Sequence, residues 1–270
     1  MTTTLELSRY TKESDGTVDR FLETLHTTVG EAACQKLAET RPEFFAEIEI
    51  ETMSVEALER LMQTLVLLDY CVSPDYRDIN EFTYKTEGDT RIYTYDNRSG
   101  DEFSVRIADN GEALIIGFDH ESELNQFAAD EIDEEFLNHI YADLPERWRA
   151  VVEQPAFSGA TTRRELTTFC LWHTDGRWVQ HKWTHGGNDD GGQSFLLGMI
   201  FPTAEAWYER NHDFHALQEG AAQILPVVRK IYDTRSVTAE DIRILFPDID
   251  ELEDEDEVLD EIRRLDMPTL

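Results

Sequence analysis

The spacing of apolar residues along the chain changes near residue 80. Before that point, apolar side chains recur every three to four residues over 18–37 and over 53–70, which is the spacing of amphipathic helices. The second stretch starts beside Ser54, a residue type that caps helix N-termini. We therefore predict that residues 1–75 form a mostly helical N-terminal segment.

Beyond residue 80 the pattern becomes that of β-strands. Short runs rich in β-branched and aromatic residues are separated by turn residues, such as the DNG at 109–111. The runs are EFTYKT, TRIYTYD, EFSVRIAD and EALIIGF. They predict an antiparallel meander of about four strands over residues 81–118.

A second β block follows two segments of helical spacing. Helices are predicted near 131–141 and 144–153, and then LTTFCLWH, RWVQHKWTH and SFLLGMIF predict further strands. The TDG at 174–176 predicts a tight hairpin between the first two of these strands. The longer stretch GGNDDGGQ predicts a hairpin loop before the third.

The C-terminal third returns to helical spacing. Thr203 is placed to open a helix that runs to Leu225, and Thr238 is placed to cap a short one. Residues 248–270 are strongly acidic but keep apolar residues at helical spacing, so we predict an acidic amphipathic C-terminal helix there.

These elements together predict an α+β fold. Two antiparallel β blocks are flanked by helices, and no strand–helix–strand alternation runs through the chain. The body of the fold is predicted to span 76–247. The pattern leaves open whether the two blocks share one sheet or form two small packed sheets.

The charge of the chain is its most unusual property. It contains 57 acidic and 24 basic residues, a formal net charge of −33, and only five of the basic residues are Lys. Such a charge repels phosphates, which argues against direct binding of nucleic acid or of an anionic membrane. Because the Debye length is only ~3 Å at 1 M salt, we interpret the acidity as adaptation to a high-salt cytoplasm. Mimicry of nucleic acid phosphates is the functional alternative.

The cysteines and apolar runs indicate a cytoplasmic protein. Cys34, Cys71 and Cys170 form no CxxC pair and are odd in number, which favours buried free thiols in a reducing compartment. The first thirty residues are polar, and no apolar run approaches the ~20 residues of a membrane span.

The first candidate site is the triplet Asp119, His120 and Glu121, which directly follows the run ALIIGF. In a continuing strand Asp119 and Glu121 would share a face and His120 would point away, so the three converge only if the chain turns. Two carboxylates on one face could bind a divalent cation or divide acid and base roles. The alternative is a polar strand end whose acids cap the next segment or face water.

The second candidate site is the stretch CLWHTDGRWVQHKWTHGG. Its aromatic and imidazole residues are Trp172, His173, Trp178, His181, Trp183 and His185. On one strand His181 and His185 would lie roughly 13 Å apart, too far to share an ion without help from Asp119 or His212. Tryptophans on a sheet more often belong to a core or to a protein-binding surface.

The remaining motifs are weak. GGNDDGGQ is a single copy of a pattern that binds calcium only when stacked in repeats. His212 and His215 form HxxH without the glutamate of HExxH, and no GxSxG is present. We therefore assign no catalytic residue, no metal ligand and no cofactor.

Three strings in the middle of the chain carry a resemblance. GFDHES, LPERWRAVVEQPAF and TTFCLWH…GRW together resemble a group of bacterial and archaeal proteins with an FDHES strand end, a PAF segment and a Cys-x-Trp strand. The resemblance covers about 117–210. That group has no assigned activity, so the resemblance implies no catalytic residue. At the level of fold alone, small acidic α+β proteins also resemble toxin-neutralising immunity proteins.

The chain is therefore expected to act by binding another protein of basic charge, in an immunity-like or adaptor-like role. The candidate binding residues are Asp119, His120, Glu121, Trp172, His173, Trp178, His181 and Trp183. One alternative is a metal-assisted hydrolase that uses Asp119, His120 and Glu121. A second alternative is a nucleic acid mimic. The pattern does not set an oligomeric state.

Overall fold

The computed structural model divides the chain into two compact units. One, the sheet unit, comprises 49–59 and 81–197; the other, the helical unit, comprises 1–48, 60–80 and 198–270. The structure describes residues 48–72, 80–155, 162–183, 189–211, 220–247 and 255–268. The helix predicted over 18–37 and Cys34 therefore lie outside the described residues.

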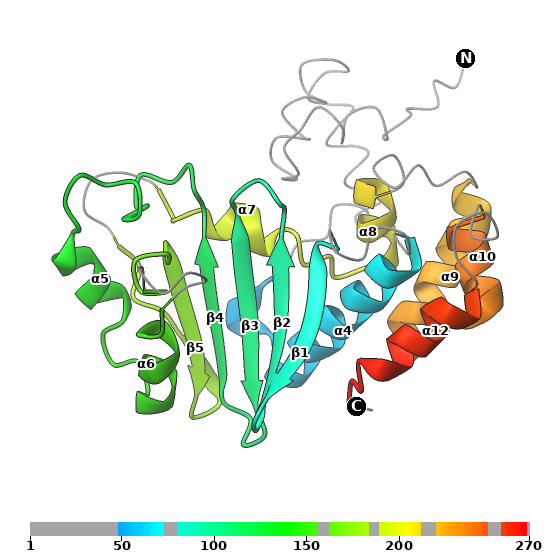
Figure 1. The fold of residues 1–270 in the computed structure, drawn as a ribbon, viewed down its shortest axis with the longest axis horizontal. Coiled ribbons are helices and arrows are strands. Elements are labelled where there is room, and N and C mark those ends of the chain that lie inside the picture. Colours follow the sequence, from blue (N-terminus) through cyan, green and yellow to red (C-terminus); the bar gives the residue numbers. More distant parts are fainter. Residues whose placement is uncertain are drawn as a thin grey trace, which may run out of the picture. The chain divides into compact units, whose positions relative to one another are not determined.

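The sheet unit is built on one six-stranded antiparallel sheet whose strands follow one another in sequence order (Figure 1). The strands are β1 Phe82–Glu87, β2 Thr90–Asp96, β3 Glu102–Ala108, β4 Ala113–Phe118, β5 Phe169–Thr174 and β6 Arg177–Val179. The predicted meander is confirmed as β1 to β4. Pairing of β4 with β5 joins both β blocks into a single sheet.

The turns between the strands have the backbone that their sequences predict. At the β5–β6 hairpin Thr174 pairs with Arg177, and the two residues between them, Asp175 and Gly176, both have positive φ. Two consecutive positive φ values define the type I′ turn that DG sequences favour, because this turn matches the twist of the strands. Gly111 of the DNG turn between β3 and β4 also has positive φ.

Two helices pack on one face of the sheet, over β4 and β5. Helix α5 (Glu134–Ile140) begins at Asp133, whose side chain accepts a hydrogen bond from the N–H of Phe136 at 3.0 Å, and α6 (Glu146–Val152) follows Pro145. Figure 1 shows both helices beside β5. The shared core contains Leu114, Ile116, Phe136, Leu137, Ile140, Trp148, Cys170 and Trp172. The alternation of side chains along β4 and β5 supplies the strand half of this core.

In the predicted second β block, one strand prediction is wrong and another strand is shorter than predicted. Helix α7 (Gln193–Leu197) takes up the first four residues of SFLLGMIF, so the described end of the GGNDDGGQ stretch leads into a helix and is not a hairpin loop. Asp190 starts this helix by accepting a hydrogen bond from the N–H of Ser194 at 2.9 Å. A short buried apolar run does not distinguish helix from strand by its period. RWVQHKWTH forms a strand only over Arg177–Val179.

The helical unit contains most of α4 (Val55–Val72), whose first turn belongs to the sheet unit. Its other described helices are α8 Ala204–Asn211, α9 Ala221–Thr234, α10 Ala239–Leu245 and α12 Glu255–Arg264. The predicted helix from Thr203 therefore corresponds to α8 and the start of α9. Of α12, only Val258 is fully buried, as expected for an amphipathic helix with a solvated acidic face.

The predicted helix caps are confirmed. Ser54 accepts a hydrogen bond from the N–H of Ala57 at 3.1 Å, and Thr238 forms a capping box with Asp241. A cap of this kind satisfies an N–H group that the first turn of a helix leaves without an intrahelical partner.

The thiols of Cys71 and Cys170 are buried and free, as predicted. Burial raises the pKa of both thiols far above their usual range. Both are therefore thiols at neutral pH and are inert packing groups. Among the described helices, none combines the length and the apolar character that a membrane span requires.

Candidate functional site

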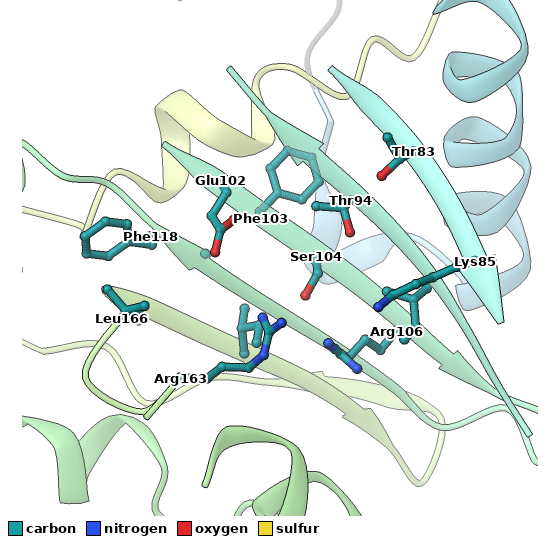
Figure 2. A pocket seen from close by; sticks show the side chains of 13 residues that line it. Thr83, Lys85, Thr94, Glu102, Phe103, Ser104, Arg106, Phe118, Arg163 and Leu166 are labelled. Carbon is teal, nitrogen blue, oxygen red and sulfur yellow. The ribbon is translucent and has the colours of Figure 1, made fainter. Parts of the chain in front are cut away.

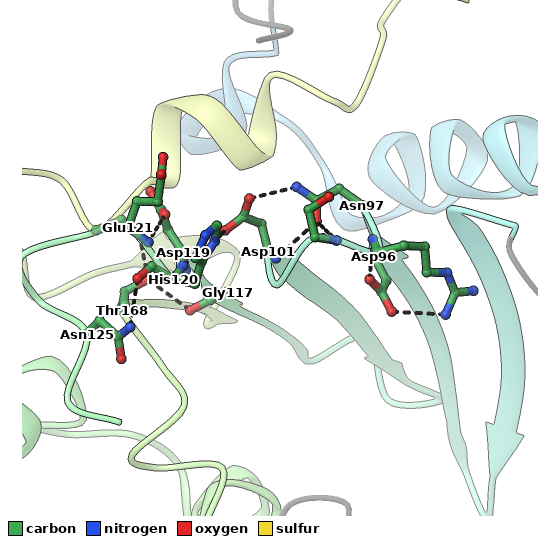
Figure 3. Close-up of polar contacts among 12 residues, drawn as sticks. Asp96, Asn97, Asp101, Gly117, Asp119, His120, Glu121, Asn125 and Thr168 are labelled. Carbon is green, nitrogen blue, oxygen red and sulfur yellow. Dashed lines mark hydrogen bonds and ion pairs between the residues drawn. The ribbon is translucent and has the colours of Figure 1, made fainter. Parts of the chain in front are cut away.

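The Asp119–His120–Glu121 triplet lies in a turn that begins where β4 ends. The N–H of Asp119 donates to Oγ1 of Thr168 at 3.1 Å, and the Asp119 carboxylate accepts from the N–H of Glu121 at 2.8 Å. These bonds bend the chain, so the strand does not continue through the triplet (Figure 3). The Asp119 side chain thus caps the following turn, whereas Glu121 is exposed to solvent.

The turn places His120 on Asp101, a residue that the sequence analysis did not select. Asp101 Oδ1 accepts the main-chain N–H of His120 at 3.0 Å and lies 2.6 Å from the ring Nδ1. Asp101 Oδ2 accepts from the side-chain amide of Asn97 at 2.6 Å. The loop between β2 and β3 is therefore bonded to the turn after β4.

The electrostatics of this cluster follow from these contacts. The hydrogen bond to Asp101 raises the pKa of His120 above its usual value. Burial alone would raise the pKa of Asp101, but hydrogen bonds from His120 and Asn97 outweigh it and lower that pKa. Burial raises the pKa of Asp119. Both shifts act toward an ionised Asp101 beside a protonated His120.

Asp101, Asp119 and His120 are the one group of three potential metal ligands among the described residues. Their ligand atoms all lie within 4.8 Å of one another. Each of the three residues already uses side-chain atoms in bonds within the protein. Glu121 is exposed and does not belong to the group. The geometry is that of a turn held together by hydrogen bonds.

The three tryptophans of the second candidate site do not form one exposed surface. Trp172 is buried in the core under α5 and α6, so it cannot contact a partner directly. Trp183 packs edge-on against the ring of Phe136, 5.6 Å between centroids. The indole N–H of Trp178 donates to the carbonyl of Met53 at 2.8 Å. These rings serve the packing of the sheet unit.

The histidines of this stretch do not converge on a common ion. His173 contacts the ring of Trp178 at 5.4 Å, whereas His181 lies 5.5 Å from Trp172 and 3.6 Å from a carboxylate oxygen of Asp143. Neighbouring residues on a strand point to opposite faces, so the contacts of 172 and 173 place the two imidazoles on opposite faces of the sheet. His185, His212 and His215 lie outside the described residues.

The stretch after the triplet, residues 121–133, is here called the acidic loop. Asn125 holds it by donating to the carbonyl of His120 at 2.8 Å and accepting from the N–H of Phe127 at 2.9 Å. Gln126 accepts from the N–H of Asp133 at 2.6 Å. Phe127 is 62% exposed and Ile132 is 43% exposed. The loop thus has a bonded frame and presents two apolar side chains to solvent.

A polar pocket of about 300 Å³ lies on the sheet face over β1 to β4. Its main lining side chains are Lys85, Glu102, Ser104, Arg106, Phe118 and Arg163. The sequence analysis missed all of them. The sequence carries a signal for three of them. In the strand EFSVRIA, the polar residues Glu102, Ser104 and Arg106 alternate with apolar residues, and the structure buries Ser104 and Arg106 as well as the apolar side.

Comparison of the chain with protein-family models, with curated proteins and with solved structures gave no match, so the resemblance noted for residues 117–210 stays a prediction.

Proposed function

We propose that the protein acts by binding another protein, and that the acidic loop is the surface that contacts it. The observation that carries this proposal is the exposure of Phe127 and Ile132, the large apolar side chains that stand out in solvent among the described residues. Large apolar anchors surrounded by polar groups are the usual energetic centre of a protein interface.

The surroundings of the two anchors favour a basic partner. Exposed acids flank them within the loop and in the first turn of α5: Glu121, Glu123, Asp130, Glu131, Asp133, Glu134 and Glu135. Complementary charge increases the rate of encounter and excludes acidic partners. In molar salt the charge is screened beyond ~3 Å, so the apolar anchors would supply most of the affinity.

The bonded frame of the loop also supports binding. Ser122 Oγ donates to Asp189 at 2.9 Å, and the N–H of Glu123 donates to the same carboxylate at 2.7 Å. A loop that is already held in one conformation loses less conformational entropy when a partner binds.

Site-specific photocrosslinking in the native host tests this proposal. A photoreactive phenylalanine analogue at position 127 should crosslink a basic protein, and the same analogue at the exposed Arg177 of the β5–β6 hairpin should not. The double substitution Phe127→Ser/Ile132→Ser should abolish recovery of that protein. Ala128→Ser/Ala129→Ser, in the same loop, is the matched control and should leave recovery unchanged.

Equal crosslinking from positions 127 and 177, or no crosslinked protein at all, would contradict the proposal. Because both apolar side chains are exposed, their replacement should change the stability of the fold by less than about 0.5 kcal/mol. A circular dichroism melt of each variant in high salt verifies that lost binding is not lost folding.

A further inference from the structure

The pocket on the sheet face holds polar side chains where a core would normally be apolar. The register of the sheet places Thr94, Ser104 and Ile116 side by side on β2, β3 and β4. They lie on the same face of the sheet that α5 and α6 cover over β4 and β5. Over β1 to β3 this face carries hydroxyl and cationic groups, and Arg163 and Leu166 from the segment after α6 form the facing wall. Figure 2 shows these side chains around one common space.

Arg106 is a buried cation whose ion pair with Glu87 is long. The residue is 6% exposed, and its Nε has no hydrogen-bond partner among the residues that the structure describes. The nearest carboxylate oxygen belongs to Glu87, 3.9 Å from Nη1, and Glu87 is half-exposed and bonded to Lys85 at 2.6 Å. A buried charge is costly unless it is paired and hydrogen-bonded.

The charge on Arg106 persists despite this environment. Burial, together with repulsion from Arg163, lowers the pKa of Arg106 to about 10. The guanidinium is therefore protonated at neutral pH, and the pocket contains a positive charge that the protein leaves incompletely compensated.

Ser104 adds a second unsatisfied group in the same place. It lies two residues before Arg106 on β3, so both side chains share a face. Ser104 is 6% exposed, and within the described part of the chain its Oγ has no hydrogen-bond partner. Nearly all buried polar groups in folded proteins are hydrogen-bonded, so two such groups beside one pocket indicate a ligand that bonds to both.

The balance of charge in the pocket is opposite to that of the chain. Three cationic side chains, Lys85, Arg106 and Arg163, line it against one carboxyl, Glu102. Burial raises the pKa of Glu102 above its usual range. A chain with a net charge of −33 thus gathers three of its 24 basic residues around one small cavity.

From this arrangement we infer that the pocket binds a small organic oxyanion, whose carboxylate or phosphate group lies between Arg106 and Arg163 and accepts a hydrogen bond from the hydroxyl of Ser104. Guanidinium groups pair with both kinds of oxyanion through parallel N–H bonds. Phe118 and Leu166 line the other end of the pocket (Figure 2), where they would contact the apolar body of the ligand. A cavity of about 300 Å³ is at the lower limit for small-molecule sites, so the ligand is small. This site is separate from the acidic loop and does not depend on the proposed function.

Isothermal titration calorimetry at constant ionic strength tests the inference with four probes. Phenyl phosphate and benzoate supply the two oxyanions, benzamide is their neutral counterpart, and inorganic phosphate lacks the apolar body. At least one of the two aromatic oxyanions should bind with one-to-one stoichiometry, about tenfold or more tighter than benzamide. The preferred probe identifies which oxyanion the ligand carries. Weaker binding of inorganic phosphate than of phenyl phosphate would show the contribution of Phe118 and Leu166.

Two substitutions that each remove one positive charge distinguish binding in the pocket from a general effect of the charge of the protein. Arg163→Gln should weaken the tighter probe by about tenfold or more, because a charged hydrogen bond is lost. Arg164→Gln, one residue away, removes a guanidinium that bonds to Glu134 at 2.8 Å outside the pocket and should leave the affinity unchanged. Arg106→Gln removes the buried cation itself but could prevent folding. Ser104→Ala is the variant to use in that case, because it keeps the charge of the pocket and should weaken binding several-fold.

Absence of saturable binding by both aromatic oxyanions, benzamide binding as tightly as benzoate, or equal losses from Arg163→Gln and Arg164→Gln would each overturn the inference. In those cases the buried polar atoms of Ser104 and Arg106 are served by solvent alone.

Discussion

A single carboxylate oxygen of Asp101 contacts His120 twice, through the main-chain N–H at 3.0 Å and the ring Nδ1 at 2.6 Å. The contact joins two segments that are 19 residues apart in sequence and lie at the same end of β3 and β4. The pairing of Glu102 with Phe118 explains why they meet, since it brings the residues flanking those positions together.

The pair predicts a pH dependence of stability. The pKa of His120 is raised in the folded protein, so protonation of its imidazole stabilises the fold. This stabilisation is fully present below the unfolded pKa of about 6.5 and is lost as pH rises through the folded pKa. The imidazole is partly exposed, so the gain should stay below about 1 kcal/mol. Urea unfolding of wild type and His120→Gln from pH 5.5 to 8.5 measures it as the difference between the two curves. A difference that does not change with pH would contradict the prediction.

The ion pair of Glu59 and Arg91 should contribute more. Glu59, the fifth residue of α4, has a side chain that is 4% exposed and accepts hydrogen bonds from Arg91 at 2.5 Å and from the hydroxyl of Tyr93 at 3.1 Å. Replacing Glu59 by Gln leaves a partly buried guanidinium without its main partner, and we expect a loss of about 3 kcal/mol of unfolding free energy. Asp109→Asn is the control, because Asp109 binds the same Arg91 at 2.6 Å but is 68% exposed. Its loss should stay below about 1 kcal/mol. Equal losses would contradict the burial argument.

Glu102 should control the pH dependence of oxyanion binding in the sheet-face pocket. Burial and the nearby Asp96 raise its pKa, while Arg163 acts against them. Because an ionised Glu102 repels a bound anion, affinity should fall as pH rises through the raised pKa of Glu102. Glu102→Gln should remove this fall and bind more tightly at neutral pH. Titrating both proteins with the same probe cancels the ionisation of the probe itself. Parallel pH profiles would exclude Glu102 as the responsible group.

The acidity of the chain predicts a requirement for salt. Self-repulsion at a net charge of −33 opposes the compact state, and salt screens it. We therefore expect the helical signal in circular dichroism and the melting temperature to rise from low to molar KCl. Full structure and an unchanged melting temperature at low salt would mean that the acids do not reflect adaptation to brine.

The meander and the capped helices could be predicted because their determinants are local. A DG turn or a Thr–x–x–Asp cap acts within a few residues, and both are found where the sequence places them. SFLLGMIF was mistaken for a strand because an apolar run of that length fits either structure. Its helix depends on Asp190 and the preceding glycines, whose conformation the run itself does not encode.

The contacts of the candidate sites could not be predicted, because they depend on register. Asp101 meets His120 only because β3 and β4 pair so that Glu102 faces Phe118. Likewise, Ser104 and Arg106 share a pocket with Arg163 only once β3 is central and the segment after α6 lies over its face. The sequence alone shows two polar residues in a strand, without the partner that gives them a role.

The order of the strands has a consequence for how the sheet unit folds. Strands β1 to β4 are joined by short turns and loops, so their contacts connect residues close in sequence. Such contacts form quickly during folding. Strand β5 is instead separated from β4 by residues 119–168, which include α5 and α6, so its pairing with β4 must close a long loop. We expect that attachment of β5, and not formation of the meander, limits the rate at which this sheet is completed.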